Sequence, residues 1–219
     1  MKYVKTVPRA PRYLPSKNMR LLIILSCVLV LDSIAFSQES VKENWLQEIG
    51  FWPGFGYGNS NRNLPEGNYQ PYYFLGHMAF KPFLKGKNSA LEKFQFYLEP
   101  QFNHVQLLGK NGSKNEFEFG LNLGVKYLLP LTKHLDLFMN IGTGPHAFSA
   151  TSASQAAGFL FSDNMGIGLY HHLNKKWAIL FTYRIRHLSN ADTRQPNKGI
   201  NTDNFHFGMS YFIGSRQQH

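Results

Sequence analysis

The sequence predicts an all-β fold, an eight-stranded antiparallel transmembrane β-barrel of the outer membrane. After an N-terminal leader, the chain falls into eight blocks in which apolar and polar residues alternate with a period of two. The blocks exceed the roughly five or six residues of typical soluble strands and match the roughly 9–11 needed to cross a bilayer. Their polar face carries charged residues in mid-strand, which an apolar interior would not accept. A barrel with lipid outside and polar residues inside satisfies all three observations.

Residues 1–37 are expected to form a signal peptide. Basic residues precede the apolar run from Leu21 to Leu31, which is too short to span a bilayer as a helix. Small residues at Ala35 and Ser37 then mark a signal-peptidase site. The mature domain, residues 38–219, is the predicted barrel.

A chain begun at Met19 would have a compact signal peptide, so residues 1–18 are a candidate mis-called start. Cys27 follows a loose lipoprotein-type cleavage box, but cleavage there would leave apolar sequence on the mature end. Cleavage after Ser37 instead leaves no cysteine for a disulfide or a thiol nucleophile.

Charge argues against a nucleic-acid partner. The chain carries 23 basic and 13 acidic residues, and removal of the leader leaves 17 against 12, a net charge of +5. This mild excess of positive charge does not indicate nucleic-acid binding. The scattered histidines show no metal-ligand spacing, so we expect no metal and no cofactor.

The fourth block shows the alternation most clearly, because every second residue from Phe117 to Leu129 is apolar and Glu118 and Lys126 lie between them. The first block is irregular: Pro53 interrupts it, and its aromatic residues Phe51, Trp52 and Phe55 are expected to form part of an interfacial girdle. In order, the eight expected strands are 45–58, 69–82, 91–105, 116–130, 134–147, 158–171, 176–189 and 203–213.

The connections predict the orientation of the barrel. Such barrels place short turns in the periplasm and long loops outside. The connections expected to be short lie near 83–90, 131–133 and 172–175, and those expected to be long lie near 59–68, 106–115, 148–157 and 190–202. The seventh strand therefore runs outward.

Polar residues end the apolar row of the seventh strand. Trp177, Ile179, Phe181, Tyr183 and Ile185 form the lipid-facing row, and His187 and Ser189 continue its parity. Residues i and i+2 of a strand share a face about 6.6 Å apart, so the imidazole can approach the hydroxyl and activate it as a nucleophile. Interfacial His and Ser also serve as simple headgroup contacts, which is the competing interpretation.

The residues around this pair resemble a known family signature. His187-x-Ser189-Asn190-Ala191 followed by Pro196-Asn197-x-Gly199 is similar to the motif of the PagL-type lipid A deacylases, the acyloxyacyl hydrolase family. The resemblance implies an eight-stranded outer-membrane barrel that removes an ester-linked acyl chain from lipid A at its lipid-facing wall. The specific motif covers residues 184–203, and the rest matches as architecture.

Carried over by position, Ser189 resembles the nucleophile and His187 the general base. Asn197 resembles an oxyanion-stabilising residue, assisted by backbone N–H groups near Ala191 and Asp192. Where the family has a glutamate as third triad member, this chain has Asn201.

An asparagine can orient the imidazole but cannot stabilise an imidazolium by charge. Asp203, on the same face, or Asp192 could substitute as the acidic partner. A defect at this position can cost about 10⁴ in turnover.

The sequence thus predicts an outer-membrane serine esterase whose partner is lipid A, or lipopolysaccharide, of the outer leaflet. The alternative is a non-enzymatic or inactive barrel with a structural or lipid-binding role. A pore is the weakest option, because side chains fill the interior of eight strands. The oligomeric state is left open, a homodimer included.

Overall fold

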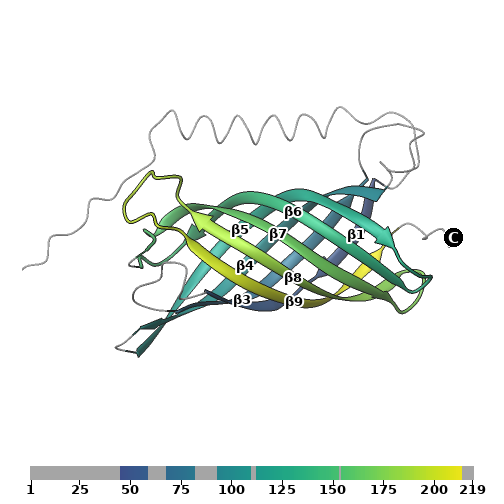
Figure 1. The fold of residues 1–219 in the computed structure, drawn as a ribbon, viewed down its shortest axis with the longest axis horizontal. Coiled ribbons are helices and arrows are strands. Elements are labelled where there is room, and N and C mark those ends of the chain that lie inside the picture. Colours follow the sequence, from purple (N-terminus) through teal and green to yellow (C-terminus); the bar gives the residue numbers. More distant parts are fainter. Residues whose placement is uncertain (1–44, 59–67, 82–92, 110–111, 153, 214–219) are drawn as a thin grey trace, which may run out of the picture. The chain divides into compact units, whose positions relative to one another are not determined.

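The computed structural model describes residues 45–58, 68–81, 93–109, 112–152 and 154–213, which form one antiparallel sheet closed into a ring (Figure 1). Its strands are β1 (Leu46–Phe51), β2 (Gly54–Gly58), β3 (Asn68–Phe80), β4 (Phe94–Gly109), β5 (Gly112–Pro130), β6 (Leu135–Phe148), β7 (Gly158–His172), β8 (Trp177–Ser189) and β9 (Ile200–Phe212). The predicted signal peptide, with Met19 and Cys27, lies outside the described residues. Among those residues, no helix is long and apolar enough to span a membrane.

β1 and β2 together act as one barrel strand. Both pair with β3 on one side and with β9 on the other, so the ring has eight strands in the barrel sense. The interruption falls at Trp52 and Pro53, as the proline predicted. The girdle assignment of Trp52 was wrong, however, because its indole is fully buried in the barrel and donates to Ser210 Oγ over 2.9 Å. Phe51 and Phe55 are exposed.

The long loop predicted near 106–115 was also wrong. β4 and β5 pair without a break from Phe94–Tyr127 to Gly109–Gly112, which leaves only residues 110–111 between them. Figure 1 shows this hairpin projecting past the neighbouring strands. At the start of β5 its residues are polar and exposed on both faces, so period-two alternation is absent and the segment resembled a loop.

The lengths of the other described connections distinguish the two ends of the barrel. We call the end with connections 149–157 and 190–199 the long-loop end, and the end with connections 131–134 and 173–176 the short-turn end. The predicted connection near 83–90 lies outside the described residues, as does that near 59–68 up to residue 67.

The polar face of each strand points inward and the apolar face outward. Glu99, Glu118 and Lys126 are fully buried inside the ring. Large apolar side chains such as Ile141, Met165 and Ile167 are about half exposed on the outer wall. This inverted arrangement is the one expected of a barrel surrounded by lipid.

Candidate active site on the outer wall

β8 carries the candidate site at its long-loop end. Exposure alternates along the strand, so that Arg186 and Leu188 point into the interior whereas His187 and Ser189 lie on the outer wall and are partly exposed. The same alternation places Ile185 beside them on the outer wall. A histidine and a serine therefore face the surroundings of the barrel rather than its lumen.

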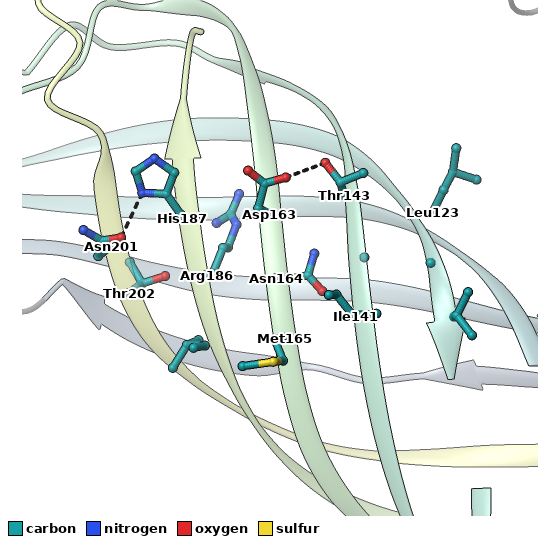
Figure 2. A pocket seen from close by; sticks show the side chains of 14 residues that line it. Leu123, Ile141, Thr143, Asp163, Asn164, Met165, Arg186, His187, Asn201 and Thr202 are labelled. Atoms are coloured by element: carbon teal, nitrogen blue, oxygen red, sulfur yellow. Dashed lines mark hydrogen bonds between the residues drawn. The ribbon is translucent and has the colours of Figure 1, made fainter. Parts of the chain in front are cut away.

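Asn201 contacts the His187 imidazole. The β8–β9 register pairs the two residues directly, and His187 Nδ1 lies 2.8 Å from Asn201 Oδ1 (Figure 2). An amide oxygen only accepts hydrogen bonds, so Nδ1 carries the proton and donates it. The other ring nitrogen, Nε2, then holds a free lone pair and can accept a proton.

The two aspartates considered as acidic partners are bound elsewhere. Tyr183 donates its hydroxyl to Asp203 Oδ1 over 2.5 Å, and Gln195 Nε2 donates to Asp192 Oδ1 over 2.6 Å. Within the described residues, neither carboxylate forms a hydrogen bond or ion pair with His187. The structure thus brings Asn201 to the imidazole, and not Asp203 or Asp192.

Ser189 lies two residues after His187 on the same face of β8. Its cross-strand partner is Phe161 on β7. In the described part of the chain, no hydrogen bond joins the Ser189 hydroxyl to the His187 ring. Catalytic hydrogen bonds often tighten only when substrate binds, so a rotation of the two side chains can complete the contact.

A tight turn follows Ser189. Ala191 and Asp192 have positive φ angles of 50° and 59°, and Thr193 N–H donates to the Asn190 carbonyl over 3.1 Å. Two consecutive left-handed residues closed by this hydrogen bond make a type I′ turn. The backbone N–H groups of Ala191 and Asp192 are not used by that bond.

Asn197 folds back onto the start of this turn. Its Oδ1 accepts the backbone N–H of Asn190 over 3.0 Å, which leaves Nδ2 as the donating end of the amide. The segment is anchored to the neighbouring 149–157 connection, because Lys198 N–H donates to the Ser154 carbonyl over 2.7 Å and Ala156 N–H to the Pro196 carbonyl over 2.9 Å. The backbone N–H groups of Ala191 and Asp192, two of the predicted oxyanion donors, thus lie in the turn that follows Ser189. The N–H of Asn190 is already engaged by Asn197 Oδ1.

Gly199 makes room for the imidazole. A Cβ at this position would lie 2.4 Å from His187 Cε1 and 3.1 Å from Nε2, and the residue has a φ of +74°. The left-handed backbone favours glycine, and the close approach of the ring leaves no room for a Cβ. The motif glycine is therefore explained by the position of the His187 ring.

A groove of about 610 Å³ runs along the outer wall beside His187. One end is polar, with Thr143, Asp163, His187 and Asn201, and the remainder includes Leu123, Ile141, Met165 and Ile185 (Figure 2). Its lining suits an apolar group with a polar head.

Asp163 and Thr143 were not among the site residues predicted from the sequence. Thr143 Oγ1 donates to Asp163 Oδ1 over 2.6 Å, and both side chains are exposed. Asp163 has the same parity as Phe161, Met165 and Ile167. Like His187 on β8, it is a polar residue in an otherwise apolar row, and this signal was present in the sequence.

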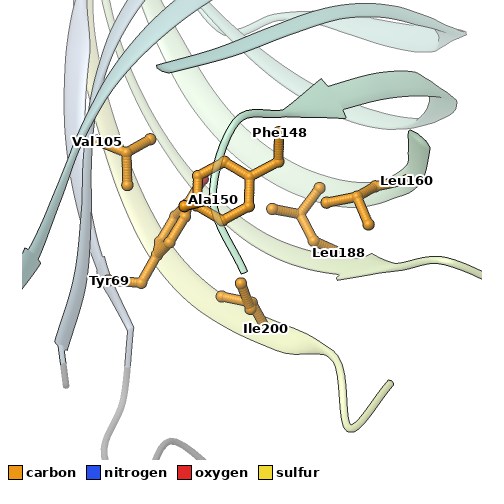
Figure 3. Close-up of a cluster of buried hydrophobic side chains, with 7 residues drawn as sticks. All are labelled: Tyr69, Val105, Phe148, Ala150, Leu160, Leu188 and Ile200. Atoms are coloured by element: carbon orange, nitrogen blue, oxygen red, sulfur yellow. The ribbon is translucent and has the colours of Figure 1, made fainter. Parts of the chain in front are cut away.

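Packing inside the barrel fixes the backbone below the site. At the long-loop end, Leu188 and Ile200, which flank the site residues of β8 and β9, belong to a buried apolar cluster (Figure 3). The other members of that cluster are Tyr69, Val105, Phe148, Ala150 and Leu160. A second apolar cluster around Trp52, Phe138 and Leu180 includes residues from the start of β8.

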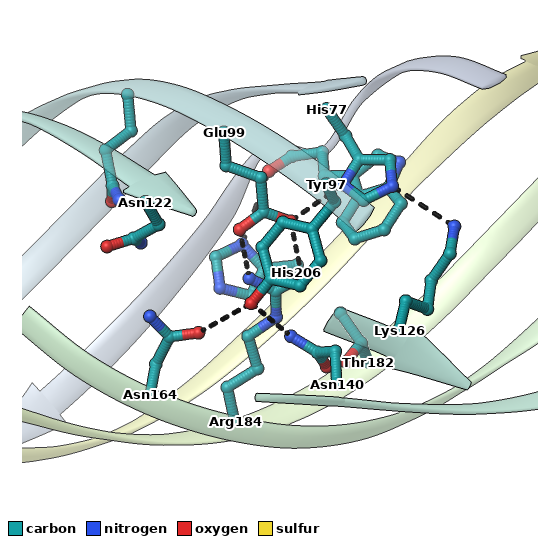
Figure 4. Close-up of polar contacts among 12 residues, drawn as sticks. His77, Tyr97, Glu99, Asn122, Lys126, Asn140, Asn164, Thr182, Arg184 and His206 are labelled. Atoms are coloured by element: carbon teal, nitrogen blue, oxygen red, sulfur yellow. Dashed lines mark hydrogen bonds and ion pairs between the residues drawn. The ribbon is translucent and has the colours of Figure 1, made fainter. Parts of the chain in front are cut away.

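Between these clusters the interior is charged and paired. Arg184 makes a bidentate contact with Glu99, with N···O distances of 2.7 and 2.8 Å (Figure 4). Arg186 bonds Glu118 and donates to Ser162 Oγ over 2.9 Å. The two inward arginines that precede His187 on β8 are thus held by ion pairs and hydrogen bonds.

Among the described residues, no group of three or more His, Cys, Asp or Glu side chains is placed to hold a metal ion.

Comparison with known proteins decides the family. A family model described as lipid A 3-O-deacylase (PagL) matches residues 33–210 of the 219-residue chain. The chain belongs to this family. The match extends far beyond the motif on which the resemblance rested. None of the curated proteins compared with the chain matches it.

Solved structures share the barrel at low identity. The outer membrane enzyme PagL is 16% identical, with 74% of this chain and 97% of that chain covered and a TM-score of 0.49. Neisserial surface protein A (NspA) is 6% identical, with 75% and 95% covered and a TM-score of 0.52. The outer membrane protein OprG from Pseudomonas aeruginosa is 10% identical, with 80% and 100% covered and a TM-score of 0.44. The fold of this PagL-family chain is the closed antiparallel β-barrel that it shares with NspA.

Proposed function

We propose that the protein is a serine esterase that hydrolyses the acyl ester on the 3-oxygen of lipid A, the bond named in the description of its family. The observation that carries the proposal is the hydrogen bond between His187 Nδ1 and Asn201 Oδ1 on the outer wall. His187 lies two residues before Ser189 in an otherwise apolar row of β8. Polar groups at a lipid-facing position are costly, and hydrolysis of a lipid ester gives them a use.

The substrate is already beside the site in this account. With the long-loop end at the outer leaflet, the ester of a lipid A molecule lies near His187 and Ser189. One acyl chain follows the apolar groove past Ile185 and Met165 toward the membrane centre. The membrane itself concentrates and orients the lipid, so a shallow groove is sufficient.

Acylation uses the free nitrogen of the imidazole. His187 Nε2 takes the hydroxyl proton of Ser189, and Ser189 Oγ forms a bond to the ester carbonyl carbon. The carbonyl oxygen becomes an oxyanion, which Asn197 Nδ2 and the backbone N–H groups of Ala191 and Asp192 stabilise. When the tetrahedral species collapses, the sugar oxygen leaves and takes the proton from His187.

Deacylation repeats the same steps with water. His187 Nε2 removes a proton from a water molecule, whose oxygen attacks the acyl-enzyme carbonyl. Collapse breaks the bond to Ser189 Oγ, which recovers its proton from His187, and the fatty acid leaves. Throughout, Asn201 keeps the ring oriented through Nδ1.

The test is the mass of lipid A in living membranes. Wild type and Ser189→Ala are produced in a bacterial host that has an outer membrane but lacks such a deacylase. Lipid A is then extracted, and its mass is measured by mass spectrometry. We expect the mass of one hydroxyacyl group to be lost in wild type and retained in the variant. Folding of both proteins is checked by heat-modifiable gel mobility.

Unchanged lipid A with two folded barrels would contradict the proposed substrate. Purified phospholipids would then be the next substrates, and absence of hydrolysis there would leave the non-enzymatic barrel as the better account.

A further inference from the structure

A polar row crosses four neighbouring strands at one level of the outer wall. Direct cross-strand pairs join Thr143 on β6 to Asp163 on β7, Asp163 to His187 on β8, and His187 to Asn201 on β9. The row therefore places His187 between an amide on one side and a carboxylate on the other. Figure 2 shows Asp163 and Asn201 on opposite sides of the His187 strand.

The row is hydrogen-bonded in two halves. Thr143 donates to Asp163 over 2.6 Å, and His187 is bonded to Asn201 over 2.8 Å. Asp163 and His187 form no hydrogen bond or ion pair within the described chain. Directly paired residues have Cβ atoms about 4.5–5.5 Å apart, so the carboxylate is close enough to act on the ring through its charge.

The position of Asp163 is otherwise unfavourable. Its neighbours above and below on the same face of β7 are Phe161 and Met165, and this wall faces lipid. An ionised side chain there is costly unless a partner or a function compensates for it. Thr143 satisfies one carboxylate oxygen, but as a neutral group it does not balance the charge.

The missing charge of the triad is on the opposite side of the ring. Asn201 is neutral, so it orients the imidazole but cannot stabilise the imidazolium that forms when Ser189 loses its proton. Two other acids lie on β9 and in the 190–199 connection. Asp203 accepts a hydrogen bond from Tyr183, and Asp192 accepts one from Gln195.

We infer that the acidic function of the triad is divided: Asn201 orients His187, and Asp163 supplies the negative charge from β7. This inference rests on the proposed function. The Ser189 proton moves to His187 Nε2, and Asp163 stays ionised and takes no proton. Asp163 is thus a positioning residue that acts through His187 and does not touch the reacting atoms.

The test is a double-mutant cycle with lipopolysaccharide as substrate and purified, folded barrels. Asp163→Asn is expected to lower kcat by about tenfold or more, because a unit charge a few ångströms away is lost in a poorly screened site, whereas KM stays within about twofold. Glu116→Gln is the matched control. Glu116 is also a carboxylate that accepts a hydrogen bond from a hydroxyl, Ser149 Oγ, over 2.7 Å. It is half-buried on β5 and lies outside the row, so its variant is expected to retain full activity.

Rescue separates charge from structure. Asn201→Glu places a carboxylate on the other side of the ring, so adding Asp163→Asn to it is expected to change kcat by less than about threefold. If Asn201→Glu does not fold, Asn201→Asp takes its place in the cycle. If Asp163 had only a structural role, a carboxylate at position 201 on β9 would not restore the kcat lost in Asp163→Asn.

The outcomes distinguish the two levels of the account. An active wild type, an inactive Ser189→Ala and a fully active Asp163→Asn would overturn the inference alone. A loss in Asp163→Asn that persists in the Asn201→Glu background would overturn it too, because the carboxylate would then act on something other than the imidazolium. A folded wild type that releases no fatty acid would overturn the proposed function, and the inference with it.

Discussion

The two faces of β8 treat polar groups in opposite ways. Inside the barrel, Arg184 and Arg186 each contact a buried glutamate, and the charged side chains of the described interior are all paired. On the outer wall, His187 holds one partner through Nδ1, and the Ser189 hydroxyl has none among the described residues. Both sets of residues are polar, but they differ in how many of their hydrogen-bonding groups are engaged.

The difference follows from what surrounds each face. The charged side chains of the interior are buried, so a charge there is tolerated only when it is paired within the protein. Outside, a lipid molecule can diffuse to the wall and provide the missing partner. Engaged polar groups are therefore structural, and unengaged ones at the same height are available for substrate.

The largest effect is expected from Ser189→Ala. Removal of a nucleophile lowers kcat by about 10⁴-fold or more and should leave the barrel fully folded. Ser162→Ala is the inward counterpart, because Ser162 Oγ accepts a hydrogen bond from Arg186. It should lower stability by about 1 kcal/mol and keep the activity of the folded fraction. Fatty-acid release and denaturant unfolding, measured on both variants, check this contrast.

Glu99→Gln is expected to have the next largest effect, on folding rather than catalysis. The substitution leaves Arg184 buried and uncompensated, which costs about 3–5 kcal/mol. Glu116→Gln, at a half-buried site without a cationic partner in the described residues, should stay within about 0.5 kcal/mol of wild type. Unfolding curves followed by heat-modifiable mobility measure both. Equal stability of the two variants would mean that the interior charges are not structural.

Asn197→Ala removes the proposed oxyanion donor. Loss of such a donor typically lowers kcat by about 10²–10³-fold. KM should change little, since the donor acts on the tetrahedral species and not on the bound ester. Lys198→Ala is the control, because only the backbone of the exposed Lys198 is engaged, by Ser154. Steady-state kinetics that showed an effect on KM alone would remove Asn197 from the oxyanion set.

Gly199→Ala should have the smallest effect, about a tenfold loss of kcat, because its methyl group would displace the His187 ring. Gly112→Ala provides the control. Gly112 also has a positive φ, of +115°, but nothing lies within 4 Å of the added carbon. The kinetics of the two variants separate backbone strain from displacement of the imidazole. Equal losses of activity would indicate strain alone.

Much of this contrast was readable from the sequence because barrel strands obey strict alternation. Parity predicted the eight strands and the polar end of the β8 row. It was not applied to two residues. Trp52 directly follows β1, and its even number continues the inward face of that strand, whereas the odd number of Asp163 assigns it to the outward face of β7. The projecting β4–β5 hairpin was hidden because alternation disappears where both faces are polar.

The choice among Asn201, Asp203 and Asp192 could not be made from the sequence. Strand register decides which residue of β9 meets His187, and that register depends on the fold of the 190–199 connection. A shift by two residues would keep every side chain on the same face and exchange Asn201 for Asp203. The three-dimensional pairing of His187 with Asn201 was therefore needed.

The most direct test of the account is covalent labelling of the folded barrel by a fluorophosphonate that bears an acyl-like tail, followed by peptide mass spectrometry. An activated serine reacts with this reagent, whereas an ordinary hydroxyl does not. The account predicts one modified residue, Ser189, with the label lost in Ser189→Ala and strongly reduced in His187→Ala. A folded wild type that remains unlabelled, or one labelled equally without His187, would contradict the claim that the outer wall carries an esterase site.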